Sequence, residues 1–251
     1  MKYKTKKNYW KQDISKNAYF KAFLQGAALI TGISYLFYGT ILGAILLSPY
    51  LIRYMKSWEK QTIQKKKQLF QTQFQEANLS VSAALNVGYS VENAMREAFR
   101  DLQLMYKKDD FIIKEFQYML RQLEMNLPVE VIWKEFSGRV EDEEVRMFVT
   151  IFAMAKRSGG DMIGIIRNTV RHISEKIEVS REIHTILTAK RLEFRIMCIV
   201  PLVMIGYLKL SFPNFVEVLY GNTLGVILMS ACLLIYVLAY EFGKYIVEID
   251  V

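Results

Sequence analysis

The sequence predicts an all-α integral membrane protein, and three observations lead to this fold class. Residues 22–52 and 223–240 hold no charged side chain, and residues 196–208 form a third uncharged stretch. Residues 53–195 are charged at the density of a soluble protein, and their apolar residues recur at spacings of three and four, as in amphipathic helices. This distribution excludes a disordered chain, a small disulfide scaffold and a simple soluble enzyme.

The first uncharged stretch predicts a transmembrane hairpin. Residues 22–52 are long for one spanning helix and short for two, because about 20 residues cross the hydrocarbon core. Seven lysines lie in residues 1–21, and six basic residues lie in residues 53–70. Since Lys and Arg are enriched on the cytoplasmic side, both flanks are expected there, with a turn near Gly39-Thr40. The alternative is a single tilted helix. No cleavable secretory signal is expected.

Two further spans are predicted near the C-terminus. The third span covers residues 196–212, with a kink at Pro201 and with Lys209 reaching the interface. Residues 213–222 form a short outer loop, and residues 223–240 form the fourth span. Residues 241–251 are a cytoplasmic tail. The chain is therefore expected to be a multi-pass protein of the cytoplasmic membrane, with its N-terminus (residues 1–21), main domain and C-terminus in the cytoplasm.

The main domain, residues 53–195, is predicted to be a cytoplasmic antiparallel bundle of six helices. Gly88 fits the left-handed position after a helix, and Ser90 caps the next helix. Acidic residues begin the fifth helix and basic residues end it, which complements the helix dipole. The expected ranges are about 57–87, 91–105, 110–125, 129–136 and 141–157, with a sixth helix from about residue 161.

The sixth helix shows no stop signal before the third span. Its first half carries an apolar seam at heptad spacing, as a bundle or coiled-coil helix needs. Its second half turns polar at Ser180, His184 and Arg191. We hypothesise that this helix transmits movement of the bundle to the third span. The seam residues are Ile166, Val170, Ile173 and Ile177.

No residue pattern in the chain predicts catalysis, a cofactor or a metal site. Residues 158–161, Ser-Gly-Gly-Asp, lack the first glycine and the lysine of a phosphate-binding loop. His172 and His184 have no metal-ligand spacing, and Cys198 and Cys232 lie in predicted spans. The acids of residues 141–144 point in different directions on a helix, which favours a dipole role. Nucleic acid is not expected as a partner, and anionic lipid head groups better explain the basic excess.

Two turns and the order of the last segments resemble the type II secretion system F family. Residues 84–94, ALNVGYSVENA, are similar to its L-x-x-G-x-S-(L/V)-x-x-A turn, and residues 145–161, VRMFVTIFAMAKRSGGD, to its apolar helix ending in G-G-(D/N). The likeness covers about residues 70–251, and Asn126 stands where the family more often has glycine. The closest likeness is to the B-type platform proteins of tight-adherence (Tad) pilus systems.

The resemblance implies a non-enzymatic inner-membrane platform that couples a cytoplasmic secretion ATPase to pilin extraction and pilus assembly. Its expected partners are that ATPase, pilin subunits, and a homologous platform protein or a second copy of itself. The alternative is a membrane-anchored signalling protein, with the heptad helix as a dimerising stalk and His172 as phosphoacceptor. The turn residues either contact a partner or only end helices; they are Gly88, Ser90, Arg157, Gly159, Gly160 and Asp161.

Overall fold

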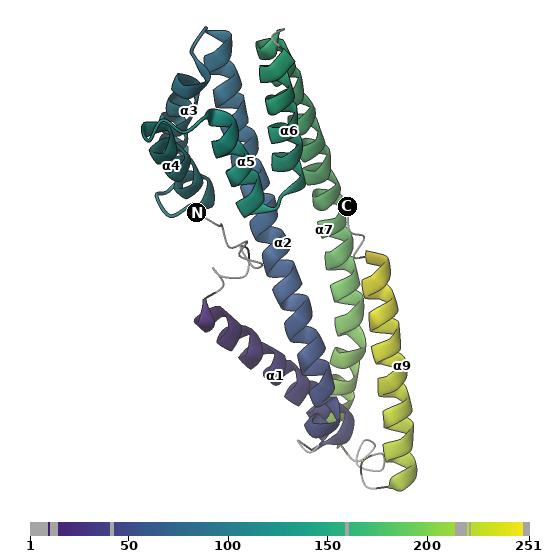
Figure 1. The fold of residues 1–251 in the computed structure, drawn as a ribbon. Coiled ribbons are helices and arrows are strands. Elements are labelled where there is room, and N and C mark those ends of the chain that lie inside the picture. Colours follow the sequence, from purple (N-terminus) through teal and green to yellow (C-terminus); the bar gives the residue numbers. More distant parts are fainter. Residues whose placement is uncertain are drawn as a thin grey trace. The chain divides into compact units, whose positions relative to one another are not determined.

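A computed structural model describes Trp10, residues 15–40, 43–158 and 161–213, Tyr220 and residues 222–247. Within these residues the chain forms eight helices and no strand, so the all-α prediction is confirmed (Figure 1). The helices are α1 (Lys16–Tyr38), α2 (Gly43–Asn86), α3 (Val91–Met105), α4 (Phe111–Glu124), α5 (Val129–Val140), α6 (Glu143–Ser158), α7 (Met162–Ser211) and α9 (Thr223–Val247).

The described residues divide into two compact units. The first unit contains Trp10 and residues 62–179, and the second contains residues 15–61 and 180–247. Helices α2 and α7 each contribute residues to both units.

The first unit is built around an aromatic core. Trp133 of α5 is fully buried, and its ring meets Phe148 of α6 with centroids 5.0 Å apart. Because buried aromatic rings contribute large apolar areas and favourable edge-to-face contacts, this cluster holds α4, α5 and α6 together. Phe116, Phe136 and Phe152 also contact the Trp133 ring, and α2, α3 and α7 add further buried residues to the core.

Helix α5 is longer than the sequence indicated. It was expected to end near Phe136 but continues to Val140, because Gly138 is accommodated within the helix. Glu141 then adopts a left-handed conformation (φ 52°) and ends α5. The next helix begins at Glu143 rather than Glu141, since the Asp142 carboxylate accepts bonds from the backbone N–H groups of Glu144 (3.0 Å) and Val145 (3.4 Å).

The second unit contains α1, the start of α2, the C-terminal part of α7, and α9. The first uncharged stretch is not one helix, because Gly39 takes a left-handed conformation (φ 66°) and α2 begins at Gly43. A helix was expected from about Ser57, but α2 already begins at Gly43.

Among the described residues, three helices are long and apolar enough to cross a membrane, namely α1, α7 and α9. Four crossings were predicted from the sequence. The apolar start of α2 is not among the three, because Arg53 follows Gly43 after ten residues, or about 15 Å of helix. Many apolar side chains of α7 and α9, such as Val203, Met204 and Ile227, are exposed on the surface, as expected for helices that face lipid.

Candidate functional site

The turn at Gly88 joins α2 to α3. Gly88 has a φ of 98°, and its N–H donates to the carbonyl of Leu85 (3.0 Å) while that of Tyr89 donates to Ala84 (3.2 Å). The Ser90 hydroxyl oxygen accepts a bond from the backbone N–H of Asn93 (3.3 Å) and so caps α3. These bonds satisfy the ends of both helices, and the Val87 and Tyr89 side chains remain exposed.

The second turn of interest joins α6 to α7. Arg157 is exposed, whereas Gly159 and Gly160 lie outside the described residues. The Asp161 carboxylate accepts a bond from the backbone N–H of Gly164 (2.8 Å), so Asp161 caps α7. Helices α2 and α6 end, and α7 begins, at the same end of the first unit (Figure 1). The structure therefore brings the two predicted turns to one end of this unit.

A lysine–glutamate pair lies near the end of α6, just before the second turn. Lys156 Nζ is 2.8 Å from Glu130 Oε1 of α5. This hydrogen bond is the main cause that lowers the pKa of Glu130 below its ordinary value. The pair holds Lys156 against α5, whereas Arg157, the next residue of α6, is exposed.

The acidic run 141–144 is divided among different partners. Asp142 caps α6 and accepts a bond from Gln71 Nε2 (3.1 Å), whereas Glu144 pairs with Lys176 of α7 (2.8 Å). The bond to Glu144 raises the pKa of Lys176. Within the part of the chain that the structure describes, no group of three or more His, Cys, Asp or Glu residues is placed to hold a metal ion.

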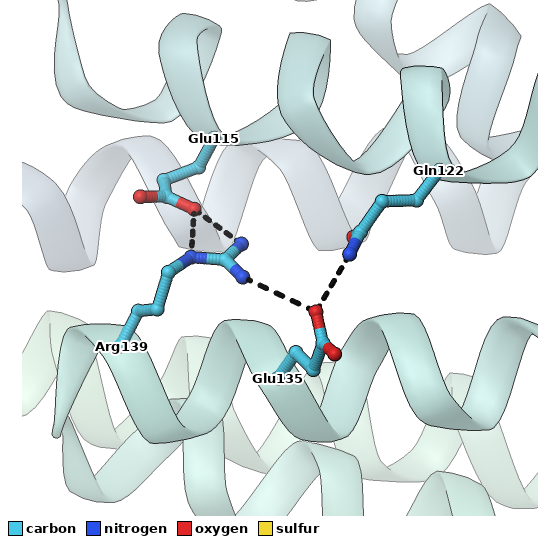
Figure 2. Close-up of polar contacts among 4 residues, drawn as sticks. All are labelled: Glu115, Gln122, Glu135 and Arg139. Carbon is cyan, nitrogen blue, oxygen red and sulfur yellow. Dashed lines mark hydrogen bonds and ion pairs between the residues drawn. The ribbon is translucent and has the colours of Figure 1, made fainter. Parts of the chain in front are cut away.

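A partly buried polar cluster joins α4 to α5, and sequence analysis did not predict it (Figure 2). Arg139 donates from Nε (3.1 Å) and Nη2 (2.7 Å) to Glu115 Oε2, and its Nη1 lies 3.9 Å from Glu135 Oε2. Gln122 Nε2 donates to the same Glu135 oxygen (2.6 Å). The guanidinium carbon also lies 4.5 Å from the centre of the Tyr118 ring, a cation–π distance.

The geometry of this cluster indicates a structural role between α4 and α5. Glu115 and Gln122 are seven residues apart on α4, and Glu135 and Arg139 are four apart on α5, so each pair lies on one helix face. These spacings were the signal that sequence analysis could have used. Opposite charges placed in this way fix the register of the two helices against each other.

The profile of the family described as type II secretion system (T2SS), protein F, matches residues 79–208. The chain belongs to the type II secretion system F family. The matched range is slightly more than half of the chain and includes both turns, the Arg139 cluster and most of α7. Members of this family are non-catalytic membrane platform proteins. Comparison with curated proteins and with solved structures finds no match for the chain.

Proposed function

We propose that this F-family protein is the non-enzymatic inner-membrane platform of a Tad-type pilus assembly machine, coupling a cytoplasmic secretion ATPase to pilin extraction and pilus assembly. The observation that carries the proposal is the family match, which extends from the end of α2 through the first unit and along α7. Helix α7 supports it, because this single helix begins in the first unit and ends in an apolar segment long enough to cross a membrane.

The burial of Trp10 supports a cytoplasmic N-terminus. Trp10 packs in the core of the first unit, and residues 62–179 belong to the same unit. A hairpin formed by the intervening residues 15–61 would leave and rejoin one side of the membrane, which fits the presence of both parts in one unit. The basic flanks, residues 1–21 and 53–70, place that side in the cytoplasm by the positive-inside rule, where they would face anionic lipid head groups.

We assign ATPase contact to the end of the first unit that carries the Gly88 and Arg157 turns. Their caps explain why the turns end helices, but the exposed Arg157, Val87 and Tyr89 side chains take no part in those caps. Arg157→Glu should weaken ATPase binding. Arg171→Glu is an equal charge reversal on α7, more than two helical turns after the start of that helix, and it should not weaken binding. Equal binding by both variants would overturn this assignment.

The heptad seam argues for a platform over a signalling stalk. Ile166, Val170, Ile173 and Ile177 are all buried in the core of the first unit, so they are not available to a second copy. The seam turns polar at Ser180, where the second unit begins. His172 is exposed beside Glu175 (3.5 Å), and His172→Gln should leave pilus assembly intact.

The experiment that tests the function is affinity purification of the tagged full chain from detergent-solubilised membranes. Retained proteins are identified by mass spectrometry, with an unrelated tagged membrane protein as control. We expect a secretion-type ATPase, a homologous helical membrane protein or a second copy of the chain, and pilin subunits. Recovery of the chain alone, or with a response regulator, would contradict the proposal.

A further inference from the structure

The second unit contains a cavity of about 370 Å³ between α1, α2, α7 and α9. This volume lies within the range of about 300–1,000 Å³ that is usual for small-molecule sites. Four basic side chains line it, together with one acidic side chain. The basic residues are Arg53, Arg191, Arg195 and Lys244, and the acidic residue is Glu241.

The cavity lies where three uncharged stretches of the sequence end. Arg53 directly follows residues 22–52, Arg195 directly precedes residues 196–208, and Glu241 directly follows residues 223–240. A boundary between an apolar run and a charge marks the edge of the hydrocarbon core. Because three separate boundaries meet at one cavity, the cavity belongs to the membrane–water interface.

The charges that line the cavity do not balance. Arg53 Nη2 pairs with Glu241 Oε2 at 3.0 Å, so the single carboxylate already has a cationic partner. Arg191 Nε is buried and, among the described residues, has no hydrogen-bond acceptor. A buried donor without an acceptor is costly, and a guanidinium is the group best suited to bind a phosphate through two parallel bonds. Arg195 lies one helical turn from Arg191 on the same face of α7.

Aromatic side chains complete the lining, among them Trp58, Phe194 and Tyr240. Trp58 of α2 packs edge-on against Tyr19 of α1 with centroids 5.3 Å apart, and Phe194 lies 5.6 Å from Tyr240 of α9. Tryptophan and tyrosine concentrate at the level of lipid head groups, since their rings suit both acyl chains and water. The cavity thus offers cations for a phosphate and apolar rings for the glycerol backbone and the upper acyl chain.

We propose that this cavity binds the phosphate of one anionic phospholipid of the cytoplasmic leaflet, with Arg191 and Arg195 as its principal donors. The bound lipid would tie α7 to α2 and α9 at the point where the spans leave the membrane. The proposal requires the second unit to lie in the membrane, but it does not depend on the platform function, so the two fail separately.

Native mass spectrometry of the full chain in detergent, titrated with phosphatidylglycerol or phosphatidylcholine, tests the site. We expect one phosphatidylglycerol to bind first, at least tenfold more tightly than phosphatidylcholine. The variant R191Q/R195Q should lose this preference. The control R181Q/K190Q removes two charges from the same helix at positions that do not line the cavity, and should change affinity less than twofold. If both variants lost the preference for phosphatidylglycerol equally, the lipid would be held by diffuse electrostatic attraction and not by a defined site, which would overturn the proposal.

Inorganic phosphate distinguishes a lipid from a soluble anion. A large excess of phosphate should leave the bound phosphatidylglycerol in place, because the lipid also contacts the aromatic lining. Displacement of the lipid by phosphate alone would show a soluble-phosphate site and contradict the lipid assignment.

A measurement on the unmutated chain keeps the test independent of folding defects. Phosphatidylglycerol with brominated acyl chains should quench the fluorescence of Trp58, and quenching should saturate at a low mole fraction in phosphatidylcholine vesicles. The quenching is assigned to Trp58, since the other two tryptophans, Trp10 and Trp133, are buried in the first unit. Quenching that rises linearly and matches that of brominated phosphatidylcholine would overturn the proposal.

Discussion

The indole Nε1 of Trp10 donates a hydrogen bond to the backbone carbonyl of Val140, 3.0 Å away and 130 residues along the chain. The ring is 7% exposed and packs against Phe70 and Phe111, with centroids 5.3 Å and 5.7 Å apart. Val140 is the last residue of α5, where carbonyl groups lack partners within the helix. Trp10 therefore closes the end of α5 and ties the N-terminal segment to the first unit.

Trp10→Ala should lower the free energy of unfolding of the first unit by about 3–5 kcal/mol, the usual cost of deleting a buried large aromatic side chain. Trp10→Phe keeps much of the ring contact but loses the hydrogen bond, and should cost about 1 kcal/mol plus a smaller packing loss. Denaturation of the full chain in detergent, followed by far-ultraviolet circular dichroism, measures both. A Trp10→Ala variant as stable as the unmutated chain would show that Trp10 does not pack in this core.

Arg139→Met should destabilise the first unit by about 3–5 kcal/mol, because it leaves the carboxylate of Glu115 buried without its cation. The Glu115 side chain is only 10% exposed. Arg100→Met is the matched control, since the Arg100–Glu97 pair has the same 2.7 Å separation but the Arg100 side chain is 72% exposed. Its cost should stay below about 1 kcal/mol. Similar denaturation midpoints for the two variants would contradict the structural role of the Arg139 cluster.

Gly88→Ala and Gly138→Ala should change stability in opposite directions. A Cβ at either position meets no atom within 4 Å, so space does not distinguish them. Gly88 has a φ of 98°, which strains any L side chain and should cost about 1–3 kcal/mol. Gly138 lies inside α5, where alanine should gain about 0.5–1 kcal/mol. Apparent melting temperatures of the two variants check the sign, and a shift in the same direction would refute the assigned turn geometry.

The stability of the first unit should fall at both extremes of pH. The hydrogen bond from Lys156 lowers the pKa of Glu130 in the folded chain. The stabilising effect of this hydrogen bond is therefore full above the unfolded pKa of glutamate, about 4.3, and is lost as pH falls through the folded pKa of Glu130. Glu144 raises the pKa of Lys176 in the folded chain. The stabilising effect of this pair is therefore full below the unfolded pKa of lysine, about 10.4, and is lost as pH rises through the folded pKa of Lys176.

Melting curves recorded across pH separate the two contributions. Glu130→Gln should flatten the acid side of the profile, whereas Lys176→Gln should flatten the alkaline side. Both pairs are partly exposed, so the effects should shrink in high salt. An acid profile that Glu130→Gln leaves unaltered would assign the acid sensitivity to other carboxylates.

Local sequence signals predicted much of the first unit. The capping serine and the apolar periodicity predicted a helix over residues 91–105, which are the bounds of α3. Asn126, which stands where the family more often has glycine, has a φ of 57°, a left-handed conformation that asparagine tolerates. Glu141 has the same conformation, but no local signal marks a glutamate for it. The position follows from the packing of α5 and α6, which is a tertiary property.

The residues that gather at the candidate sites were less predictable. The order and spacing of the turns at Gly88 and Arg157 indicated the family, whereas their presence at one end of the first unit depends on how α2, α6 and α7 pack. Trp10 lies in a lysine-rich segment that is typical of a solvated flank, and the partners described above, Phe70, Phe111 and Val140, are at least 60 residues away. The cavity of the second unit likewise joins four helices, and in the sequence only the charge at the end of each apolar run marked its position.

Helix α7 offers a test of how movement of the first unit reaches the membrane. We expect α7 to act as one stiff element through Ser180, where its residues pass from the first unit to the second. Replacing residues 179–181 with three glycines should weaken the helix there, since each glycine costs about 1 kcal/mol relative to alanine. Three alanines at the same positions remove the same side chains and keep the helix. Pilus assembly should fall in the glycine variant and persist in the alanine variant, and equal assembly by both would remove α7 as the transmitting element.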